Sequence, residues 1–419
     1  MIENTNLDFE SYINLYRGHT RIDRALFIAE NCSALEIEAY LFALNDIKSG
    51  THDVDKYLAC IKKLNAALTR RNQPVIEPDN EWVQTTTTRN KQTLDELEAE
   101  LKTYKNSMVK ESIRVAQTKL GDYYYDIGEL TQATRHYSQT RSYCVTSKNM
   151  VDMCFSMIKT QLEARHYPNV YTYIVRAEST PQIPDKINTI SQLKCYNAIS
   201  SLFVTDSNSN RYTTISNALT QGVALESSHL LNDIMAPNDV AIYGGLCALA
   251  SLNRRQLQDL LNNNISFKGY LELEPQIREI MDLFQASKYS SCFALLDKYR
   301  NDWKLDLYLN SHVDNIIQCI REKAIVQYCI PYSSIDMNRM AFAFNTTVDN
   351  LELDLVRLIG QSGKITARID SHEKILYANQ KNQRKQAFDQ SLTLGKDYEK
   401  SAKALMLRLN LLKADLVVR

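Results

Sequence analysis

Apolar residues recur three or four positions apart along almost the whole of this 419-residue chain. Early examples are Ile22, Leu26, Ile28 and Ala29, followed by Ile37, Tyr40, Leu41 and Leu44. Such spacing lines up the apolar side chains on one face of a helix. The chain has only 11 Gly and 8 Pro, which disfavours the many tight turns of a strand-rich fold. The sequence therefore predicts a mainly α protein, of about three domains or one extended array.

The segment from residue 120 to residue 137 has the spacing of a helical-hairpin repeat. The tetratricopeptide pattern is matched by Leu120, Gly121, Tyr124, Gly128, Ala133 and Tyr137. Small residues in this pattern let two antiparallel helices approach, and the large ones pack one helix into its neighbour. Further helix pairs are expected at 150–163 with 167–178 and at about 187–203 with 211–225. We expect these pairs to form an array that does not close on itself and exposes long binding faces.

Loops and a long helix are expected around this array. Residues 70–80 contain two prolines and no periodicity, so they are predicted to form a loop. A single long helix is then expected from about Thr93 to Tyr125. A polar loop, Asp206–Asn210, is expected within the last helix pair.

The order of elements after residue 312 is that of a winged helix. An apolar helix at 312–330 ends before Pro331, and a short helix follows from Asp336 to Phe344. A capping box of Thr346 and Asp349 is predicted to open a third helix, which ends at Gly360. Residues 364–370 then alternate apolar and polar, 371–374 turn, and 375–378 return, which predicts a β-hairpin.

The chain is predicted to end in one more helix with a single apolar seam. The seam has heptad spacing and consists of Tyr398, Ala402, Leu405, Leu409, Leu412 and Leu416. The helix either packs back on its own domain or contacts other proteins in a coiled coil or bundle. We favour the second interpretation.

Charge and cysteine content exclude several classes of protein. The 49 basic and 49 acidic residues balance, which gives no overall attraction to nucleic acid or an anionic membrane. Residues 1–50 carry a net charge of −4 and residues 379–419 a net charge of +5, so both ends are either solvated helix faces or contacts with other chains. No signal peptide or membrane span is expected. The nine scattered cysteines are interpreted as buried reduced thiols.

No motif points to catalysis. The sequence contains no P-loop, no GxSxG elbow and no HExxH or HxH pair, so no catalytic, cofactor or metal site is predicted. The winged helix raises nucleic-acid binding as an alternative. Its third helix, however, carries Asp349, Glu352 and Asp354 against Arg357, a face that repels phosphates.

Several strings of the sequence resemble a known family of scaffold subunits. The longest are residues 236–250, 267–276, 287–289, 341–347 and 368–378, with shorter matches at 21–22, 27–29, 121–123, 143–144 and 177–180. Helical repeats followed by a winged helix and a last helix resemble the PCI family, which is shared by the proteasome lid, the COP-nine signalosome and initiation factor three. The strings are similar to the subunit-one branch of the signalosome. The polar stretch 181–234 and a short N-terminus depart from that pattern.

The resemblance implies both a fold and a function. The expected fold is a right-handed helical-repeat array over residues 1–237, a PCI domain over 238–378 with its winged helix at about 312–378, and a tail helix over 379–419. The implied function is that of a non-catalytic scaffold in the cytoplasm and nucleus. It would support removal of the ubiquitin-like modifier Nedd-eight from cullins and so regulate cullin–RING ubiquitin ligases.

The resemblance also implies partners. Signalosome subunits two and three are expected beside the chain through PCI edges, all subunits through a bundle of C-terminal helices, and cullin–RING ligases as external partners. Membrane contact is not expected. The candidate interface residues are Ile365, Ala367, Ile369, Tyr377, Tyr398, Ala402, Leu405, Leu409, Leu412 and Leu416. The alternatives are the homologous proteasome lid subunit, a nucleic-acid-binding PCI protein, or an enzyme without a recognisable motif.

Overall fold

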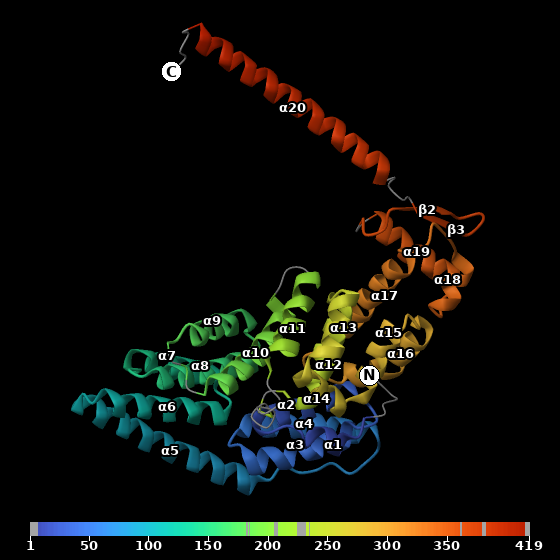
Figure 1. The fold of residues 1–419 in the computed structure, drawn as a ribbon. Helices are drawn as coiled ribbons and strands as arrows, with labels where there is room; N and C mark the ends of the chain where they lie inside the picture. Colours follow the sequence, from blue (N-terminus) through green and yellow to red (C-terminus); the bar gives the residue numbers. More distant parts are fainter. Residues whose placement is uncertain are drawn as a thin grey trace. The chain divides into compact units, whose positions relative to one another are not determined.

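The computed structural model describes residues 7–181, 183, 185–204, 208–223, 232–233, 235–360, 363–378 and 383–414. The chain divides into two compact units between residues 324 and 325. Both units are built mainly from helices, and strands occur only after residue 333 in the described part of the chain (Figure 1). The predicted mainly α fold is therefore confirmed.

The first unit begins with four helices around a shared apolar core. They are α1 (Phe9–Ile13), α2 (Gly18–Asn31), α3 (Glu36–Gly50) and α4 (Val54–Arg70). The side chain of Asp53 accepts a hydrogen bond from the backbone amide of Lys56 and so caps α4. Buried residues of all four helices form one cluster, which Leu305 joins from far along the chain.

The long helix expected from Thr93 to Tyr125 is wrong, because the structure has two helices there. Helix α5 (Asn80–Ser107) ends at Met108, which has a left-handed φ of 54°, and α6 (Lys110–Ile127) follows. The chain turns back at Met108, so that Leu101 packs in one cluster with Ile113 and Leu120. A single straight helix would keep Leu101 away from these partners. The loop predicted before α5 is confirmed.

The predicted helical hairpin at residues 120–137 is confirmed. Helix α6 packs against α7 (Leu130–Thr140), and Gly128 ends α6 with a φ of 89°. The ring of Tyr137 lies so close to Gly121 that an added Cβ would be 2.5 Å from a ring carbon. Two antiparallel helices approach most closely where one of them has no side chain. The small and large residues of the repeat thus have the packing roles predicted for them.

The two further pairs of the array also form. Their helices are α8 (Ser147–Glu163), α9 (Tyr167–Glu178), α10 (Lys186–Val204) and α11 (Asn208–Gly222), with a 3-10 turn at Arg141–Tyr143 before α8. Each helix packs against the next one in the chain (Figure 1). Of the polar loop expected at 206–210, residues 206 and 207 lie outside the described residues, and 208–210 already belong to α11.

Two of the strings that carry the family resemblance, 236–250 and 267–276, lie in the helices that follow the array. Five helices follow the array: α12 (Pro237–Ser251), α13 (Arg254–Asn263), α14 (Ile265–Leu273), α15 (Pro275–Gln285) and α16 (Tyr289–Lys304). Helix α12 is buried along most of its length and packs against α11, α14 and α15. The resemblance in 236–250 and 267–276 therefore coincides with core packing.

The second unit contains the predicted winged helix with one strand more than expected. Helix α17 (Val313–Cys329) crosses the division between the units and is followed by β1 (Ser334–Asp336), α18 (Met337–Ala343), α19 (Val348–Gly360), β2 (Ala367–Asp370) and β3 (Ile375–Ala378). The hairpin of β2 and β3 is confirmed. Strand β1 was not predicted, because three residues show no alternation; it pairs antiparallel with β3, which gives the order β1-β3-β2.

Two further features of this unit concern helix ends. The predicted capping box is wrong, because α19 begins at Val348 and the hydroxyl of Thr346 has no hydrogen-bond partner among the described residues. Asp336 instead caps α18, accepting a hydrogen bond from the amide of Asn338 at 2.8 Å. The last element is α20 (Gln383–Lys413), which confirms the predicted tail helix.

Candidate interaction surfaces

The four candidate interface residues near the hairpin do not share one face of the sheet. Ala367 and Ile369 lie on the edge strand β2, and Ile369 is paired with the buried Leu376. Tyr377 lies on the central strand β3, paired on both sides, with its side chain 44% exposed. Ile365 precedes β2 and is buried. Of these strands, only β1 and β2 keep a free edge for pairing with another chain.

The seam of α20 is exposed in the second unit. Its large side chains Tyr398, Leu405, Leu409 and Leu412 are between 50% and 78% exposed, and Ala402 is half-buried. Leu416 lies outside the described residues. Leu394, four residues before Tyr398, is also exposed and continues the seam by one turn. Leu394 was not among the residues predicted for the seam, although its spacing already indicated it.

Helices α18 and α19 add exposed apolar side chains that were not predicted from the sequence. Phe342 on α18 is 87% exposed, and Leu353 and Val356 on α19 are exposed too. All three lie on a different face of their helix from the buried residues, of which Met340 and Leu355 are examples. A helical projection would have separated the two faces. It would not have shown that the described residues of the unit leave the face with Phe342, Leu353 and Val356 exposed.

Some charged side chains of the winged helix pair with one another within the domain. Glu352 of α19 accepts hydrogen bonds from Ser371 and from Lys374, the latter at 2.8 Å. These contacts hold the pKa of Glu352 below its ordinary value. Lys374 is one of the few basic residues of the hairpin, and its pairing reduces the positive charge available for phosphates.

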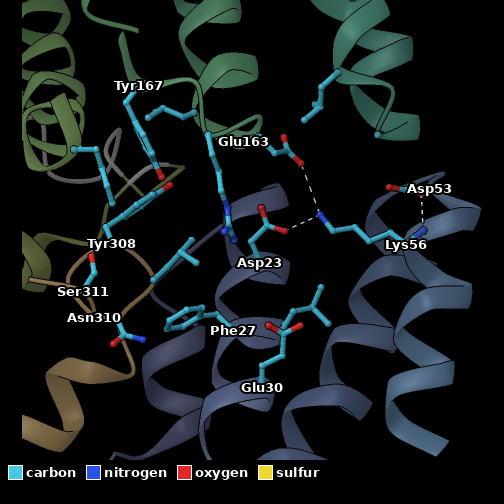
Figure 2. A pocket seen from close by; sticks show the side chains of 17 residues that line it. Asp23, Phe27, Glu30, Asp53, Lys56, Glu163, Tyr167, Tyr308, Asn310 and Ser311 are labelled. Atoms are coloured by element: carbon cyan, nitrogen blue, oxygen red, sulfur yellow. Dashed lines mark hydrogen bonds and ion pairs between the residues drawn. The ribbon is translucent and has the colours of Figure 1, made fainter. Parts of the chain in front are cut away.

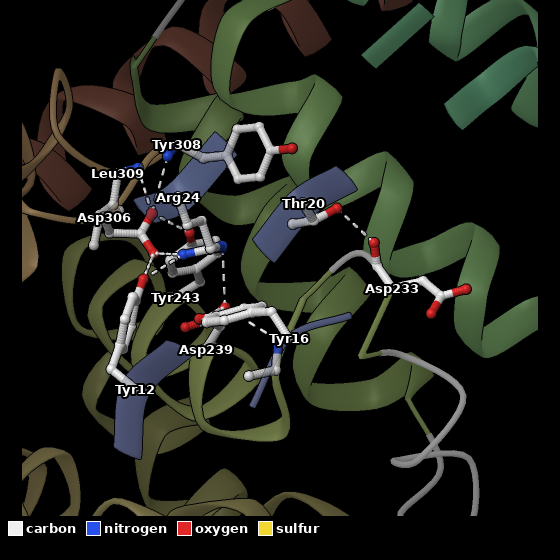
Figure 3. Close-up of polar contacts among 11 residues, drawn as sticks. Tyr12, Tyr16, Thr20, Arg24, Asp233, Asp239, Tyr243, Asp306, Tyr308 and Leu309 are labelled. Carbon is white, nitrogen blue, oxygen red and sulfur yellow. Dashed lines mark hydrogen bonds and ion pairs between the residues drawn. The ribbon is translucent and has the colours of Figure 1, made fainter. Parts of the chain in front are cut away.

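A buried charged network joins distant parts of the first unit (Figure 3). Arg24 of α2 is 1% exposed, and its guanidinium lies 3.1 Å from a carboxylate oxygen of Asp239 and 2.5 Å from one of Asp306. Tyr16 donates to Asp239 at 2.7 Å, and Tyr243 donates to Asp306. The guanidinium carbon also lies 4.1 Å from the centre of the Tyr16 ring, within range of a cation–π contact.

The two carboxylates of this network differ in their electrostatics. Burial raises the pKa of Asp239 above its ordinary value, and the neighbouring carboxylate of Asp306 adds to the rise. Burial also acts on Asp306, but Arg24, Tyr243 and the amide of Leu309 hold its pKa below the ordinary value. Asp306 receives more donors than Asp239, so Asp306 is the carboxylate that carries the charge opposite Arg24.

The network connects segments that lie far apart in the sequence. Arg24 lies 215 residues from Asp239 and 282 residues from Asp306 in the sequence. The N-terminal helices therefore contact α12 and the turn after α16, and the spacing of the helix pairs did not predict these contacts. Arg24 is one of the buried residues of α2, and its burial was not predicted from the sequence. Neither partner could be assigned from sequence spacing.

The described part of the chain has neither a cluster of metal-binding side chains nor a helix that could span a membrane. It contains no group of three or more His, Cys, Asp and Glu side chains that could hold a metal ion. No described helix is both long and apolar enough to cross a membrane. All nine cysteines are thiols that are at least half-buried, in agreement with their interpretation from the sequence.

The fold and these surfaces define a class of protein. Helical repeats that lead into a winged helix with free sheet edges, followed by an exposed apolar helix, are typical of PCI scaffold subunits. The family model of the PCI domain matches residues 296–380. The model of the 26S proteasome subunit RPN7 matches residues 79–260, and that of the COP9 signalosome complex subunit 1, C-terminal helix, matches residues 383–408.

Relatives that match nearly the whole chain identify the family within this class of scaffold subunits. COP9 signalosome complex subunit 1 of Arabidopsis thaliana is 36% identical over 99% of this chain and 91% of its own length. Subunit 1b of the complex from Drosophila melanogaster is 33% identical over 100% of this chain and 88% of its own. The 26S proteasome non-ATPase regulatory subunit 6 of Caenorhabditis elegans is 20% identical over 70% of this chain and 71% of its own. The chain belongs to the COP9 signalosome complex subunit 1 family.

Proposed function

We propose that this chain is a non-catalytic scaffold subunit of a COP9 signalosome. In this role it supports removal of the ubiquitin-like modifier Nedd-eight from cullins and so regulates cullin–RING ubiquitin ligases in the cytoplasm and nucleus. Membership of the subunit 1 family supports the proposal. The main observation in its favour is the seam of α20. This seam is exposed, and the helix that bears it matches the C-terminal helix of that family over residues 383–408.

The seam supports a particular mode of assembly. An isolated helix with a continuous apolar face gains stability by covering that face with partner helices. The other signalosome subunits are the proposed partners in such a bundle. Neighbouring subunits two and three are proposed to contact the free edges of β1 and β2 by strand addition. The proposed domains remain those expected from the sequence, residues 1–237, 238–378 and 379–419.

Co-purification tests the proposal. The tagged full-length chain is purified from its source cells, the associated proteins are identified by mass spectrometry, and the eluate is incubated with a neddylated cullin. We expect signalosome subunits in the eluate and cleavage of the modifier. Location is measured by fluorescence microscopy of the tagged chain. Recovery of the chain without other signalosome subunits would contradict the proposal.

A second candidate is a subunit of the proteasome lid. The observation in its favour is the match of residues 79–260 to the proteasome subunit RPN7 model. The same purification separates the two candidates, because a lid subunit would bring proteasome subunits with it. The 20% identity to the proteasomal relative, against 36% to the signalosomal one, favours the signalosome.

A further inference from the structure

Carboxylates around a pocket of the first unit pair with basic side chains of the same unit. Figure 2 shows Lys56 between Asp23 and Glu163, and its amine lies 2.6 Å from an oxygen of Asp23 and 3.7 Å from one of Glu163. Glu30, which also lines the pocket, lies 2.6 Å from the amine of Lys63. These charges compensate one another within the chain.

The end of α20 carries charge of one sign only. Residues 400–414 contain four basic side chains and no acidic one. The amines of Lys400 and Lys403 lie 3.9 Å and 2.6 Å from carboxylate oxygens of Asp397 and Glu399, one turn earlier in the helix. The nearest acidic residues of the helix are therefore already paired.

The other two basic side chains, Arg408 and Lys413, are exposed and are not compensated by their own helix. An acidic side chain on the same helix compensates a basic one when it lies three or four residues away. All residues at these distances from Arg408 and from Lys413 are uncharged. The charge of both side chains is therefore available to another chain.

Arg408 and Lys413 lie on opposite sides of the apolar seam. With Leu405 and Leu412 at position d of the heptad and Leu409 at position a, Arg408 falls at position g and Lys413 at position e. Side chains at e and g lie next to the partner helix and set which partner the seam accepts. Positive charge at both positions favours a partner with negative charge there.

A second copy of α20 does not fit these charges in a parallel pair. In such a pair, position g of one helix lies beside position e of the next heptad of the other helix. Arg408 would then lie beside Lys413 of the second copy, on both sides of the pair. Like charges beside each other disfavour an interface, so the seam favours a different helix over its own copy.

We propose that the seam of α20 binds an amphipathic helix of another subunit that carries Asp or Glu on both sides of its own apolar seam. This inference rests on the proposed scaffold function and specifies the chemistry of the helix that α20 meets. The seam keeps heptad spacing from Tyr398 to Leu412, which is the spacing that follows a second helix. Acidic side chains beside that second seam would compensate Arg408 and Lys413.

Two designed peptides test the inference with the full-length chain. Both repeat a heptad with Ile at a and Leu at d, and they differ only at e and g, which are all Glu in one peptide and all Lys in the other. Fluorescence anisotropy at physiological salt should show about tenfold tighter binding of the Glu peptide. The preference should decrease as the salt concentration rises. Equal affinity, tighter binding of the Lys peptide, or no saturable binding of either peptide overturns the proposal.

Variants assign the preference to the two flanking residues. Arg408→Glu with Lys413→Glu should reverse it, so that the Lys peptide binds more tightly. Lys396→Glu with Lys400→Glu makes the same change of charge at positions b and f, on the side of the helix away from the seam, and should keep the preference for the Glu peptide. Reversal in both variants would show that only the net charge of α20 matters and would overturn the proposal.

Other occupants of the seam give different results. Sedimentation velocity of the full-length chain should show no dimer that depends on the seam. A dimer that Leu409→Asp with Leu412→Asp abolishes would assign the seam to a second copy and overturn the proposal. Vesicles of phosphatidylcholine and phosphatidylserine should not displace the Glu peptide, and displacement would assign the seam to a lipid surface and overturn it too.

Co-purification separates this inference from the proposed function. Signalosome subunits in the eluate, together with equal affinity for the two peptides, would contradict the acidic partner and leave the scaffold function supported. A preference for the Glu peptide without signalosome subunits in the eluate would contradict the scaffold function and leave the acidic partner helix supported.

Discussion

At the scale of single residues, the contact between Gly121 and Tyr137 gives the first prediction. Gly121→Ala should lower the free energy of unfolding by about 1–2 kcal/mol, because the new methyl group overlaps the ring. The ring cannot move away freely, since its hydroxyl donates to Asp122 at 2.6 Å. Urea denaturation of the full-length chain measures the change.

The control for this substitution is Gly50→Ala at the end of α3. A Cβ at Gly50 would meet nothing within 4 Å, so its unfolding free energy should be unchanged or slightly higher. If both variants lose the same stability, the close packing of α6 and α7 is not responsible for the effect.

Lys323 gives a prediction about pH. Its amine donates to the carbonyl oxygens of Leu249, at 2.6 Å, and Leu252, and burial lowers its pKa to about 8. The folded chain therefore binds fewer protons than the unfolded chain between pH 8 and about 10.4, the ordinary lysine pKa. The contribution of Lys323 to stability should rise with pH through this window. Across this window the free energy of unfolding of the unchanged chain should rise by roughly 2–3 kcal/mol relative to that of Lys323→Met.

Urea denaturation of both chains at several pH values between 7 and 10.5 measures this difference. The hydrogen bonds lost in the variant shift its stability by a constant amount, so only the slope against pH is diagnostic. Lys119→Met, at an exposed lysine on α6, is the control and should show a constant difference. A constant difference for Lys323→Met as well would contradict the prediction.

At the scale of elements, periodicity predicted most helices and failed at particular ends. The three-and-four spacing that ends at Met108 starts again at Val109, so the reversal left only a one-residue change of phase in the sequence. That reversal depends on a left-handed residue and on the burial of Leu101 against α6, which is a contact between two helices. Strand β1 likewise exists only because β3 lies beside it.

The seam of α20 gives a prediction for assembly. Leu409→Asp with Leu412→Asp should remove the chain from its complex and leave its own unfolding transition unchanged, because both side chains are already exposed. Charges within an apolar bundle would be buried without partners. Co-purification with the tagged chain measures assembly, and circular dichroism checks the fold.

Leu392→Asp with Leu407→Asp is the matched control on the same helix. Both leucines are exposed and project away from the seam at 100° per residue. This variant should still assemble. Loss of assembly in both double variants would show that helix propensity, and not the seam, is what the complex requires.

At the scale of the whole molecule, the Arg24 network joins the start of the chain to segments more than 200 residues away. Arg24→Met leaves Asp239 and Asp306 buried without their cation and should lower the free energy of unfolding by about 3–5 kcal/mol. Chemical denaturation of the full-length chain measures this loss. Adding Asp306→Asn to Arg24→Met should restore part of it, because one unpaired charge is then removed.

Arg300→Met is the control for the network. Arg300 pairs with Asp314 at the surface, so its loss should cost no more than about 1 kcal/mol. A similar cost for Arg24→Met, or no recovery on adding Asp306→Asn, would show that the network does not hold the N-terminal helices in their packing.

The sequence by itself determined the helical class, the hairpin of residues 120–137, the winged helix and the seam of α20. These features depend on contacts within a few residues or between adjacent elements, and such contacts leave a periodic pattern. Only the tertiary structure decided the path of the chain after Met108, the partners of Arg24 and the free edges of the sheet. Each of them is a contact, or the lack of one, between segments whose separation along the chain carries no periodic signal.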